Sequence, residues 1–323
     1  MERLVVIGGD AGGMSAASQA RRRRDPSELE IVVLERGRYT SYSACGIPYW
    51  VGTDIGSDTD LIVRTPEEFA RSAIEVRIGL EATEIDPAGR QVRAGDQTLA
   101  FDQLLVATGA TPVRPRIPGI DLPGVYGVQT LDDGRAVIEA MGSESRRAVV
   151  IGGGYIGLEM AEALIRRGLE VTLIEAGEQP MSTVDPDLGV HISEAMRGMG
   201  IEVLLQSRVD ALNGSDRVRS AVAAGREIPA DLVILGLGVR PNSALARDAG
   251  IACGASGGIA VDRRMRSTSH EFVWAAGDCV ESFHRLTGRG VNIALGTHAN
   301  KQGRVAGINI GGGYATFPGV IGT

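Results

Sequence analysis

Two glycine-rich loops, each preceded by an apolar strand, constrain the fold of this 323-residue chain more than any other feature. In the first, a short buried strand over 3–7 runs into Gly8-Gly9-Asp10-Ala11-Gly12-Gly13, and a helix is expected over 14–24. A second strand over 31–34 ends at Glu35, an acidic residue suited to accept hydrogen bonds from a ribose. This order predicts a βαβ unit in which N–H groups at the helix N-terminus bind a pyrophosphate. Because Asp10 replaces the second glycine of the G-x-G-x-x-G pattern, a tight turn in an ordinary parallel sheet remains the alternative.

The second loop matches the same pattern in full. An apolar strand over 148–151 leads into Gly152, Gly154 and Gly157, which occupy all three glycine positions. A helix is expected up to Arg167, and the next strand, 171–174, ends at Glu175. Two such units in one chain predict an α/β protein with two Rossmann-like dinucleotide-binding domains built on parallel sheets.

The remaining segments extend this prediction to the whole chain. Alternating segments between 80 and 105 predict a small antiparallel excursion, and prolines between 112 and 123 indicate a crossing between domains. Further strands are expected at 104–110, 231–236 and 272–278, and further helices at 187–199 and 297–308. We therefore expect a discontinuous first domain, 1–112 with 243–323, and a second domain at 113–242.

The bulk composition excludes several classes of protein. The chain is 43% hydrophobic and 23% charged, as in ordinary globular proteins, and its net charge of −7 does not favour nucleic-acid binding. Its three cysteines and four histidines show no metal-ligand spacing, and the odd cysteine count argues against a secreted disulfide framework. No apolar run approaches the length of a membrane span, and no signal segment opens the chain. These observations predict a cytoplasmic protein without a metal site and without nucleic-acid or membrane partners.

One cysteine stands apart from the other two by its surroundings. Cys45 lies in Ser41-Tyr42-Ser43-Ala44-Cys45-Gly46-Ile47-Pro48-Tyr49, soon after the first glycine loop and Glu35. A free cysteine is commonly a small buried residue, and Cys253 and Cys279 are expected to be structural. For Cys45 a redox role is the stronger interpretation, and Ser41 and Cys45 would share one face if the segment were helical.

The two loops, Ala107-Thr108-Gly109 between them and Gly277-Asp278 after them resemble the flavin-dependent pyridine nucleotide–disulfide oxidoreductases over essentially the whole chain. The resemblance implies that the first loop binds FAD and the second NAD(P)H. It also implies that Asp278 hydrogen-bonds the ribityl chain and that the helix near His298 directs its positive N-terminal dipole at the flavin. Glu175 favours NADH, because a carboxylate repels the 2′-phosphate of NADPH, and NADPH is the alternative.

The resemblance also implies sets of site residues. Those expected to bind the two cofactors are Gly8, Asp10, Ala11, Gly12, Gly13, Glu35, Arg36, Ala107, Thr108, Gly109, Gly152, Gly154, Tyr155, Ile156, Gly157, Glu159, Glu175, Gly238, Gly277, Asp278 and Ala299. Catalysis is expected from Cys45 and Ser41, and a coenzyme A pocket from Ser15, Gln19, Arg22, Ser41, Ala44 and His298. The plainer alternatives are a solvated helix end for Arg22, simple packing for Tyr155 and a surface position for Glu159.

The cysteine pattern sorts the branches of this family. Thr40 stands where dithiol members carry a second cysteine, no Cys-x-x-Cys is present, and Ser41 with Cys45 matches the Ser-x-x-x-Cys of the single-cysteine branch. Ala11 stands where peroxidases and water-forming oxidases carry a histidine, which points to the coenzyme A-disulfide reductase side, whereas Ala44 departs from the asparagine common there.

The resemblance thus implies an FAD-dependent NAD(P)H oxidoreductase that reduces a low-molecular-weight disulfide or persulfide, coenzyme A disulfide above all, through Cys45. The alternatives are an NADH oxidase cycling through a cysteine sulfenic acid, an NADH-dependent reductase of an electron-transfer protein, and a non-enzymatic flavin redox sensor. Family members continue into a C-terminal interface domain that makes a homodimer, and residues 317–323 resemble the strand leading into it. The resemblance implies that this chain lacks that domain and, alone, reduces disulfides poorly.

Overall fold

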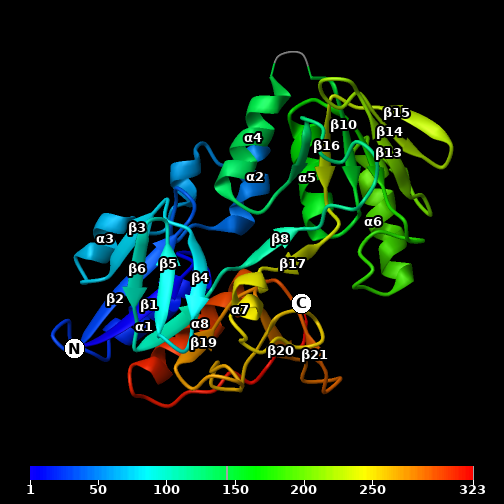
Figure 1. Cartoon of the computed structure of the whole chain (residues 1–323). Coiled ribbons are helices and arrows are strands. Elements are labelled where there is room, and N and C mark those ends of the chain that lie inside the picture. The colour runs from blue at the N-terminus through cyan, green and yellow to red at the C-terminus, as the bar shows by residue number, and fades with distance from the viewer. Residues whose placement is uncertain (143–144, 323) are drawn as a thin grey trace. The chain divides into compact units, whose positions relative to one another are not determined.

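The computed structural model describes residues 1–142 and 145–322 and divides into two units. The first comprises Met1–Tyr42, Ile62–Thr111 and the chain from Arg240 onward, and the second comprises Ser43–Leu61 and Pro112–Val239. The chain crosses from one to the other at β8 (Ala110–Pro112) and β17 (Val239–Pro241), which pair with each other (Figure 1). The sequence prediction keeps residues 43–61 in the first domain, whereas the contacts assign them to the second unit.

A five-stranded parallel sheet in the order β19-β7-β1-β2-β3 forms the centre of the first unit. Its strands are β1 (Glu2–Ile7), β2 (Leu29–Glu35), β3 (Glu75–Ile78), β7 (Gln103–Val106) and β19 (Val273–Ala275). Residues 4–7, 31–34 and 104–106 are all buried, as continuous apolar runs are when both faces of a parallel sheet are covered.

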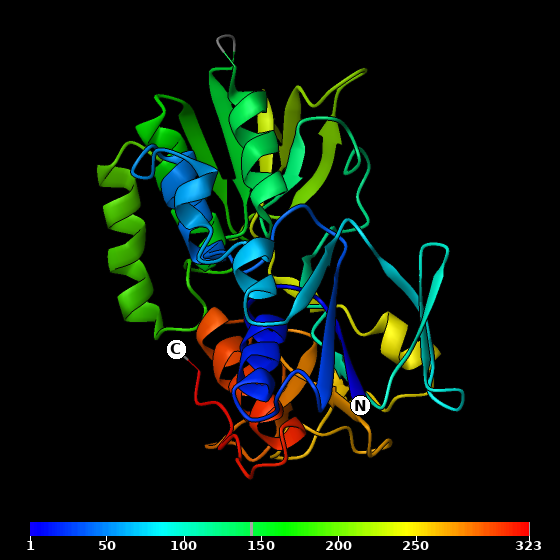
Figure 2. The ribbon, with the colours of Figure 1, turned by 90° about the vertical axis from the view of Figure 1, so that its left-hand side faces the viewer.

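Two helices of the first unit, α1 (Ala11–Arg21) and α8 (Gly296–Ile310), lie side by side (Figure 2, blue and red). Their close approach depends on glycine, because a Cβ at Gly303 would lie 2.1 Å from Gly12 O and one at Gly307 2.2 Å from Ala16 O. Helix α1 begins directly after Asp10, earlier than predicted, and ends at Arg21. The chain tightens into a turn there, because the N–H groups of Arg23 and Arg24 both donate to the carbonyl oxygen of Ala20 at 3.0 Å.

Smaller elements complete the first unit. The antiparallel sheet of β4 (Ala82–Asp86), β5 (Gln91–Ala94) and β6 (Gln97–Ala100) confirms the predicted excursion. A further sheet contains β18 (Ile259–Ala260), β20 (Val280–Phe283) and β21 (Gly290–Val291), and the short helices are α3 (Pro66–Ala70) and α7 (Ala244–Asp248).

The second unit repeats the design with a parallel sheet in the order β12-β11-β10-β16-β9. Its strands are β9 (Val125–Gly127), β10 (Arg147–Ile151), β11 (Glu170–Ile174), β12 (Glu202–Leu204) and β16 (Leu232–Leu235). Its helices are α2 (Ile47–Val51), α4 (Leu131–Met141), α5 (Tyr155–Arg166) and α6 (Pro186–Gly198), with the 3-10 turns η1 (Ala44–Gly46) and η2 (Asp58–Leu61). An antiparallel sheet of β13 (Val209–Asn213), β14 (Ser220–Ala223) and β15 (Arg226–Pro229) is attached. The predicted α/β class with two Rossmann-like units is confirmed.

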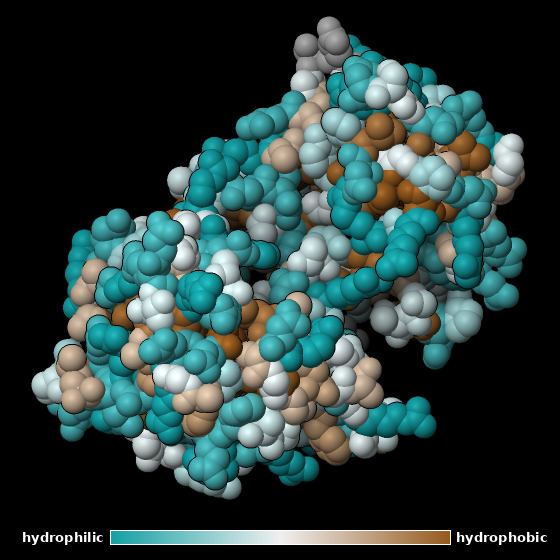
Figure 3. All heavy atoms as spheres, viewed as in Figure 1, coloured by the Kyte–Doolittle hydropathy of each residue, from teal (hydrophilic) through white to brown (hydrophobic). Residues whose placement is uncertain are grey.

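The face of the molecule drawn in Figure 3 is mostly hydrophilic, and its hydrophobic side chains gather mainly on the second unit. Within residues 1–142 and 145–322, no helix combines the length and the apolar character that crossing a membrane requires.

Candidate functional site

The first glycine loop is closed by tight backbone approaches. Gly8 has φ +106°, and a Cβ there would lie 2.1 Å from Ala107 O, so the end of β1 meets the end of β7. A Cβ at Gly13 would lie 1.9 Å from Gly8 O. Only glycine fits such positions without displacing backbone. The loop therefore presents bare backbone at the N-terminus of α1, the kind of place where proteins bind phosphate.

Glu35, at the end of β2, ties the loop from its other side. Its Oε2 accepts the Gly9 N–H at 2.7 Å, and its Oε1 accepts the Gly37 N–H at 2.6 Å. A carboxylate has about four acceptor sites, so these two bonds leave capacity for hydroxyl donors. The role of Glu35 toward a ribose stays a prediction, and the structure adds an internal role in shaping the loop.

Asp10 stands at the N-cap position of α1 but does not cap the helix with its side chain. Its Oδ1 instead accepts the Tyr42 N–H at 3.1 Å. Burial raises the pKa of Asp10 to about 7; the negative charges of Glu35 and Asp278 add to this, and the Tyr42 N–H opposes it. The loop therefore contains a carboxyl group that gains or loses its proton near neutral pH.

Asp278 lies just after β19, and burial raises its pKa to about 6, while the Leu295 N–H lowers it. The loop around Asp278 is held by two amide side chains. Gln302 Oε1 accepts the Gly277 N–H at 2.8 Å, and Asn292 Nδ2 donates to Asp278 O at 2.7 Å. The predicted flavin-contacting aspartate thus sits on a backbone with little freedom.

Sequence reasoning misses Gln302 and Asn292. Gln302 is 2% exposed, and its Nε2 donates to Ser282 Oγ at 2.8 Å, so both ends of its amide are paired. One sequence signal could have found Gln302, because it lies on the side of α8 that carries the glycines contacting α1. A polar side chain on such a buried side is expected to be hydrogen-bonded.

The second glycine loop has the same closure. Gly152 has φ +99°, and a Cβ there would lie 2.4 Å from Gly236 O. A Cβ at Gly157 would lie 1.9 Å from Gly152 O. Glu175 Oε2 accepts the Gly153 N–H and its Oε1 accepts the Gly177 N–H, both at 2.6 Å. The acidic residue predicted to select NADH is therefore also part of this loop's own framework.

Residues at the start of α5 are accessible. Tyr155 is 44% exposed and Ile156 36%, and Gly238 is exposed with φ +79°. Glu159 is half-buried, and burial raises its pKa, which the nearby charge of Glu162 raises further. Glu159 lies one turn into the helix that follows the loop. Its raised pKa differs from that of a fully solvated surface carboxyl group.

The other predicted cofactor residues of the first unit surround its loop. Gly109 has φ +66°, and Thr108 Oγ1 donates to Asn242 O at 2.6 Å. Ala299 is buried, and a Cβ at Gly277 would lie 3.6 Å from the Ala299 Cβ. Arg36 is exposed, and its Nη1 lies 3.8 Å from Glu81 Oε1.

Cys45 lies in η1, and its residue is exposed. The turn is anchored within the second unit, because the Ser43 N–H donates to Leu61 O at 2.9 Å and a Cβ at Gly46 would lie 2.2 Å from Leu61 Cδ2. Helix α2 follows and packs against α4 and α5. A Cβ at Gly134 would lie 2.8 Å from Ile47 Cγ2, so the contact with α4 is close.

The prediction that Ser41 and Cys45 share a helical face is wrong. Ser41 has φ +51°, and the first helical turn begins only at Ala44. The backbone of Ser41 is engaged on both sides, because its N–H donates to Gly9 O at 3.1 Å and its O accepts the Val63 N–H at 2.8 Å. These bonds hold the residue in the left-handed region and keep it out of a helix.

Apart from Ser41, the residues predicted for coenzyme A come from α1 and its C-terminal end, from α8 and from η1. Ser15 Oγ donates to Asn300 Oδ1 at 2.8 Å, so α1 and α8 bring these side chains together. Gln19, on α1, is half-buried, and Arg22, at the end of that helix, is exposed. On α8, burial lowers the pKa of His298, whose ring lies edge-on to Phe317 at 6.4 Å between centroids. Ala44 belongs to η1 in the second unit.

The remaining cysteines are less accessible than Cys45. Cys253 is half-buried and Cys279 is fully buried. Cys279 Sγ donates to Ala276 O at 3.4 Å and to Val106 O at 3.5 Å, and burial raises its pKa to about 11. A thiol with such a pKa stays protonated and unreactive at neutral pH.

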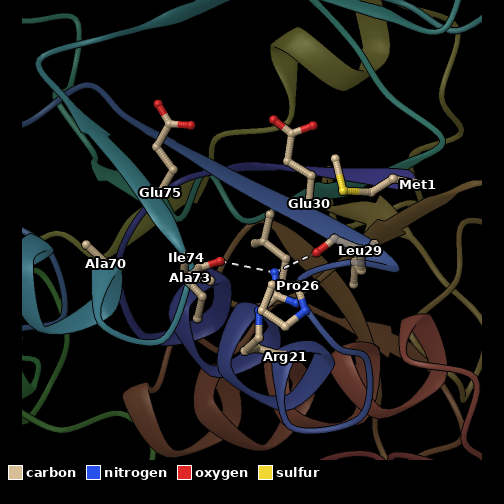
Figure 4. A pocket seen from close by; sticks show the side chains of 10 residues that line it. Met1, Arg21, Pro26, Leu29, Glu30, Ala70, Ala73, Ile74 and Glu75 are labelled. Atoms are coloured by element: carbon tan, nitrogen blue, oxygen red, sulfur yellow. Dashed lines mark hydrogen bonds between the residues drawn. The ribbon is translucent and has the colours of Figure 1, made fainter.

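A surface pocket of about 370 Å³ lies elsewhere on the first unit (Figure 4). Arg21 forms part of its wall, and its Nη2 donates to Leu29 O at 2.6 Å and to Ala73 O at 3.0 Å. None of the predicted site residues lines this pocket. We interpret Arg21 as a structural residue that joins the end of α1 to neighbouring backbone.

Comparison with known proteins places this geometry in a family. The model of the family described as pyridine nucleotide-disulphide oxidoreductase matches residues 2–303. The chain therefore belongs to the pyridine nucleotide-disulphide oxidoreductase family, as the sequence predicts.

Individual proteins with similar sequences or structures bear names from two kinds of enzyme, sulfur or persulfide reductases and NADH oxidases. The NAD(P)H sulfur oxidoreductase (CoA-dependent) of Pyrococcus abyssi is 40% identical, over 99% of this chain and 72% of that protein. The NADH oxidase of Methanocaldococcus jannaschii is 35% identical, over 98% of this chain and 71% of that protein. The solved structure of a NAD-dependent persulfide reductase from A. fulgidus superposes with a TM-score of 0.95 at 39% identity, over 98% of this chain. This chain spans 61% of that structure's chain.

Proposed function

We propose that this protein is an FAD-containing reductase that uses NADH to reduce a low-molecular-weight disulfide or persulfide, with coenzyme A as the thiol. The observation that carries the proposal is Cys45, the most accessible of the three cysteines, in a chain with two dinucleotide-type loops. Similarity to proteins named for CoA-dependent sulfur and persulfide reduction supports this substrate class.

The first loop fits FAD, because its glycines leave a backbone cradle that any Cβ would fill. The N-terminus of α1 would hold the diphosphate, and Glu35 and Asp278 would contact the ribose and the ribityl chain. The second loop fits NADH in the same way, with Glu175 at the adenosine ribose. Bound FAD supplies the transfer of two electrons from the nicotinamide to sulfur.

Cys45 carries out the sulfur chemistry. Its thiolate attacks one sulfur of a disulfide RSSR, the S–S bond breaks, RS⁻ leaves, and a mixed disulfide between Cys45 and R–S forms. A hydride equivalent from NADH then cleaves the mixed disulfide and gives RSH and the Cys45 thiolate again. The sum is NADH + H⁺ + RSSR → NAD⁺ + 2 RSH.

The proposal is tested by comparing Cys45→Ser with Cys279→Ser. Cys45→Ser should keep flavin and its reduction by NADH, yet lose coenzyme A disulfide turnover. Cys279→Ser is the matched control and should be nearly silent, since a hydroxyl group can donate to one of the two carbonyl oxygens near the thiol. Mass spectrometry under non-reducing conditions should find coenzyme A on Cys45. Parent-rate turnover in Cys45→Ser would refute the central role of this thiol.

An NADH oxidase is the second candidate, favoured by the 35% identity with the protein of that name from M. jannaschii. In that case Cys45 would cycle through a sulfenic acid. Oxygen consumption that matches NADH oxidation in the absence of any disulfide would select the oxidase. Slow NADH oxidation that neither oxygen nor disulfide raises would argue against both candidates.

A homodimer remains a prediction, as does a cytoplasmic location. The mass of the flavin-loaded protein in solution tests the homodimer.

A further inference from the structure

Asp10 occupies a loop position that does not require glycine for its backbone. Its φ of −115° and ψ of −154° are extended values that any residue adopts. The matching position in the second loop is Gly154, which is also extended, at φ −79° and ψ −176°. The carboxyl group in the first loop is therefore an addition to a backbone that forms without it.

The Asp10 carboxyl joins the loop to the segment that leads to Cys45. Asp10 Oδ1 accepts the Tyr42 N–H at 3.1 Å, and beside this bond Gly9 O accepts both the Ser41 N–H, at 3.1 Å, and Thr40 Oγ1. Two adjacent loop residues thus hold three consecutive residues of the segment. Tyr42 is the last of these three residues and precedes Cys45 by three positions in the chain.

The charges around Asp10 oppose an anion in the same loop. The charged groups that act on Asp10 are Glu35 from β2 and Asp278 from the loop after β19, and both are negative. The N–H groups of Tyr42 and Ala11 favour its ionised form, but burial outweighs them, and the pKa of Asp10 is about 7. A diphosphate at the N-terminus of α1 would bring further negative charge and favour the protonated carboxyl group.

We propose that Asp10 is a positioning residue that takes up a proton when a diphosphate fills the first loop and that keeps Tyr42, and with it the segment 40–42, tied to that loop. This inference rests on the proposed binding of FAD. A protonated carboxyl group still has a carbonyl oxygen for the Tyr42 N–H, so the tie survives the change of charge. Binding of the diphosphate in the loop and the position of residues 40–42 then both depend on Asp10.

The first test measures the FAD affinity of this chain between pH 6 and pH 9. In the wild type, affinity should fall as pH rises above about 7, by up to about tenfold per pH unit, because binding requires one proton to be taken up. Asp10→Asn keeps the shape and the acceptor oxygen without the titration, so this part of the pH dependence should disappear. Asp102→Asn is the matched control, since Asp102 Oδ2 also accepts a backbone N–H, that of Arg3 at 2.7 Å. Its pH profile should equal that of the wild type.

The second test measures hydrogen exchange of the Tyr42 amide by mass spectrometry. Asp10→Ala removes the acceptor, and Tyr42 exchange should become about tenfold faster or more, whereas in Asp10→Asn it should remain slow. Equal pH profiles for wild type and Asp10→Asn, or equal Tyr42 exchange in wild type and Asp10→Ala, would overturn the proposal. A wild-type chain that binds no FAD at any pH would instead refute the proposed function, so the two failures are distinguishable.

Discussion

The two glycine loops share one construction and differ in one charge. In each, a Cβ on the last glycine would lie 1.9 Å from the carbonyl oxygen of the first. In each, a glutamate at the end of the next strand accepts the N–H of the loop's second residue and of the glycine two positions after itself. The third position is Asp10 in the first loop and Gly154 in the second.

This difference separates the glycines that the backbone needs from the one it does not need. A Cβ at Gly154 would lie 3.8 Å from Gly236 O, an ordinary contact, so a side chain fits there. The closing glycines have no such room. Variation at the third position therefore bears on charge near the ligand, while variation at the closing positions bears on whether the loop forms at all.

The largest expected effect comes from the closing glycines. Gly13→Ala and Gly157→Ala each force a Cβ onto a carbonyl oxygen, at a cost of about 3 kcal/mol or more for the unit concerned. Gly13→Ala should abolish flavin retention. Gly157→Ala should retain flavin but lose its reduction by NADH, measured anaerobically by the bleaching of the flavin band. Loss of flavin in both variants would show that the loops do not have separate roles.

The second largest effect is expected from the two loop glutamates, Glu35 and Glu175. Glu35→Gln and Glu175→Gln each replace one acceptor oxygen by an NH₂ group that faces a backbone N–H, so one charge-assisted bond is lost, worth about 1.5–3 kcal/mol. We expect weaker FAD binding in the first variant and weaker NADH binding in the second, by about tenfold to a hundredfold. Titration of each ligand checks this. Glu175→Gln should also narrow the preference for NADH over NADPH in kcat/KM, and a preference for NADPH in the wild type would refute the assignment of Glu175.

Moving the carboxyl group between loops gives a smaller effect. Gly154→Asp should weaken NADH binding at pH 8 by about five- to thirtyfold, about 1–2 kcal/mol of repulsion, and less at pH 6. Gly154→Asn, with the same shape and no charge, should bind NADH like the wild type at both pH values. If both variants weakened binding equally, bulk rather than charge would be the cause.

The smallest effect concerns stability of the flavin-free chain. The pKa of Asp278 is raised to about 6, above the ordinary value of 3.8, so its folded form binds the proton more tightly than its unfolded form. Its contribution is favourable below about pH 4 and is lost as pH rises through about 6. Asp278→Asn should therefore raise the unfolding temperature at pH 8 by about 2–4 °C and leave it unchanged at pH 4. An increase of the same size at both pH values would contradict the assignment.

Sequence reasoning succeeds for the elements whose pattern is repeated and long. Both βαβ units, their glycine loops and the glutamates at 35 and 175 follow from apolar strands and spacing alone. The partners of these glutamates could not be predicted, because they are backbone N–H groups that carry no sequence signal. The spacing of Ser41 to Cys45 allows a shared helix, whereas hydrogen bonds to Gly9 and Val63 hold Ser41 outside one. The assignment of 43–61 to the second unit could not be predicted either. The helix α2 in this segment has five residues, too few for its hydrophobic pattern to show which face is buried.

That short helix has a consequence for how the chain is made. The apolar side chains of α2, Ile47, Trp50 and Val51, are synthesised before the helices α4 and α5 that cover them. At about 5–20 residues per second, the wait is on the order of ten seconds. During that time the segment bearing the proposed redox cysteine lacks the two helices that it packs against in its own unit. A ribosome-bound chain stopped before residue 131 should therefore expose this segment to protease and to chaperones, and a fragment made of 112–239 alone would lack one of its packing layers.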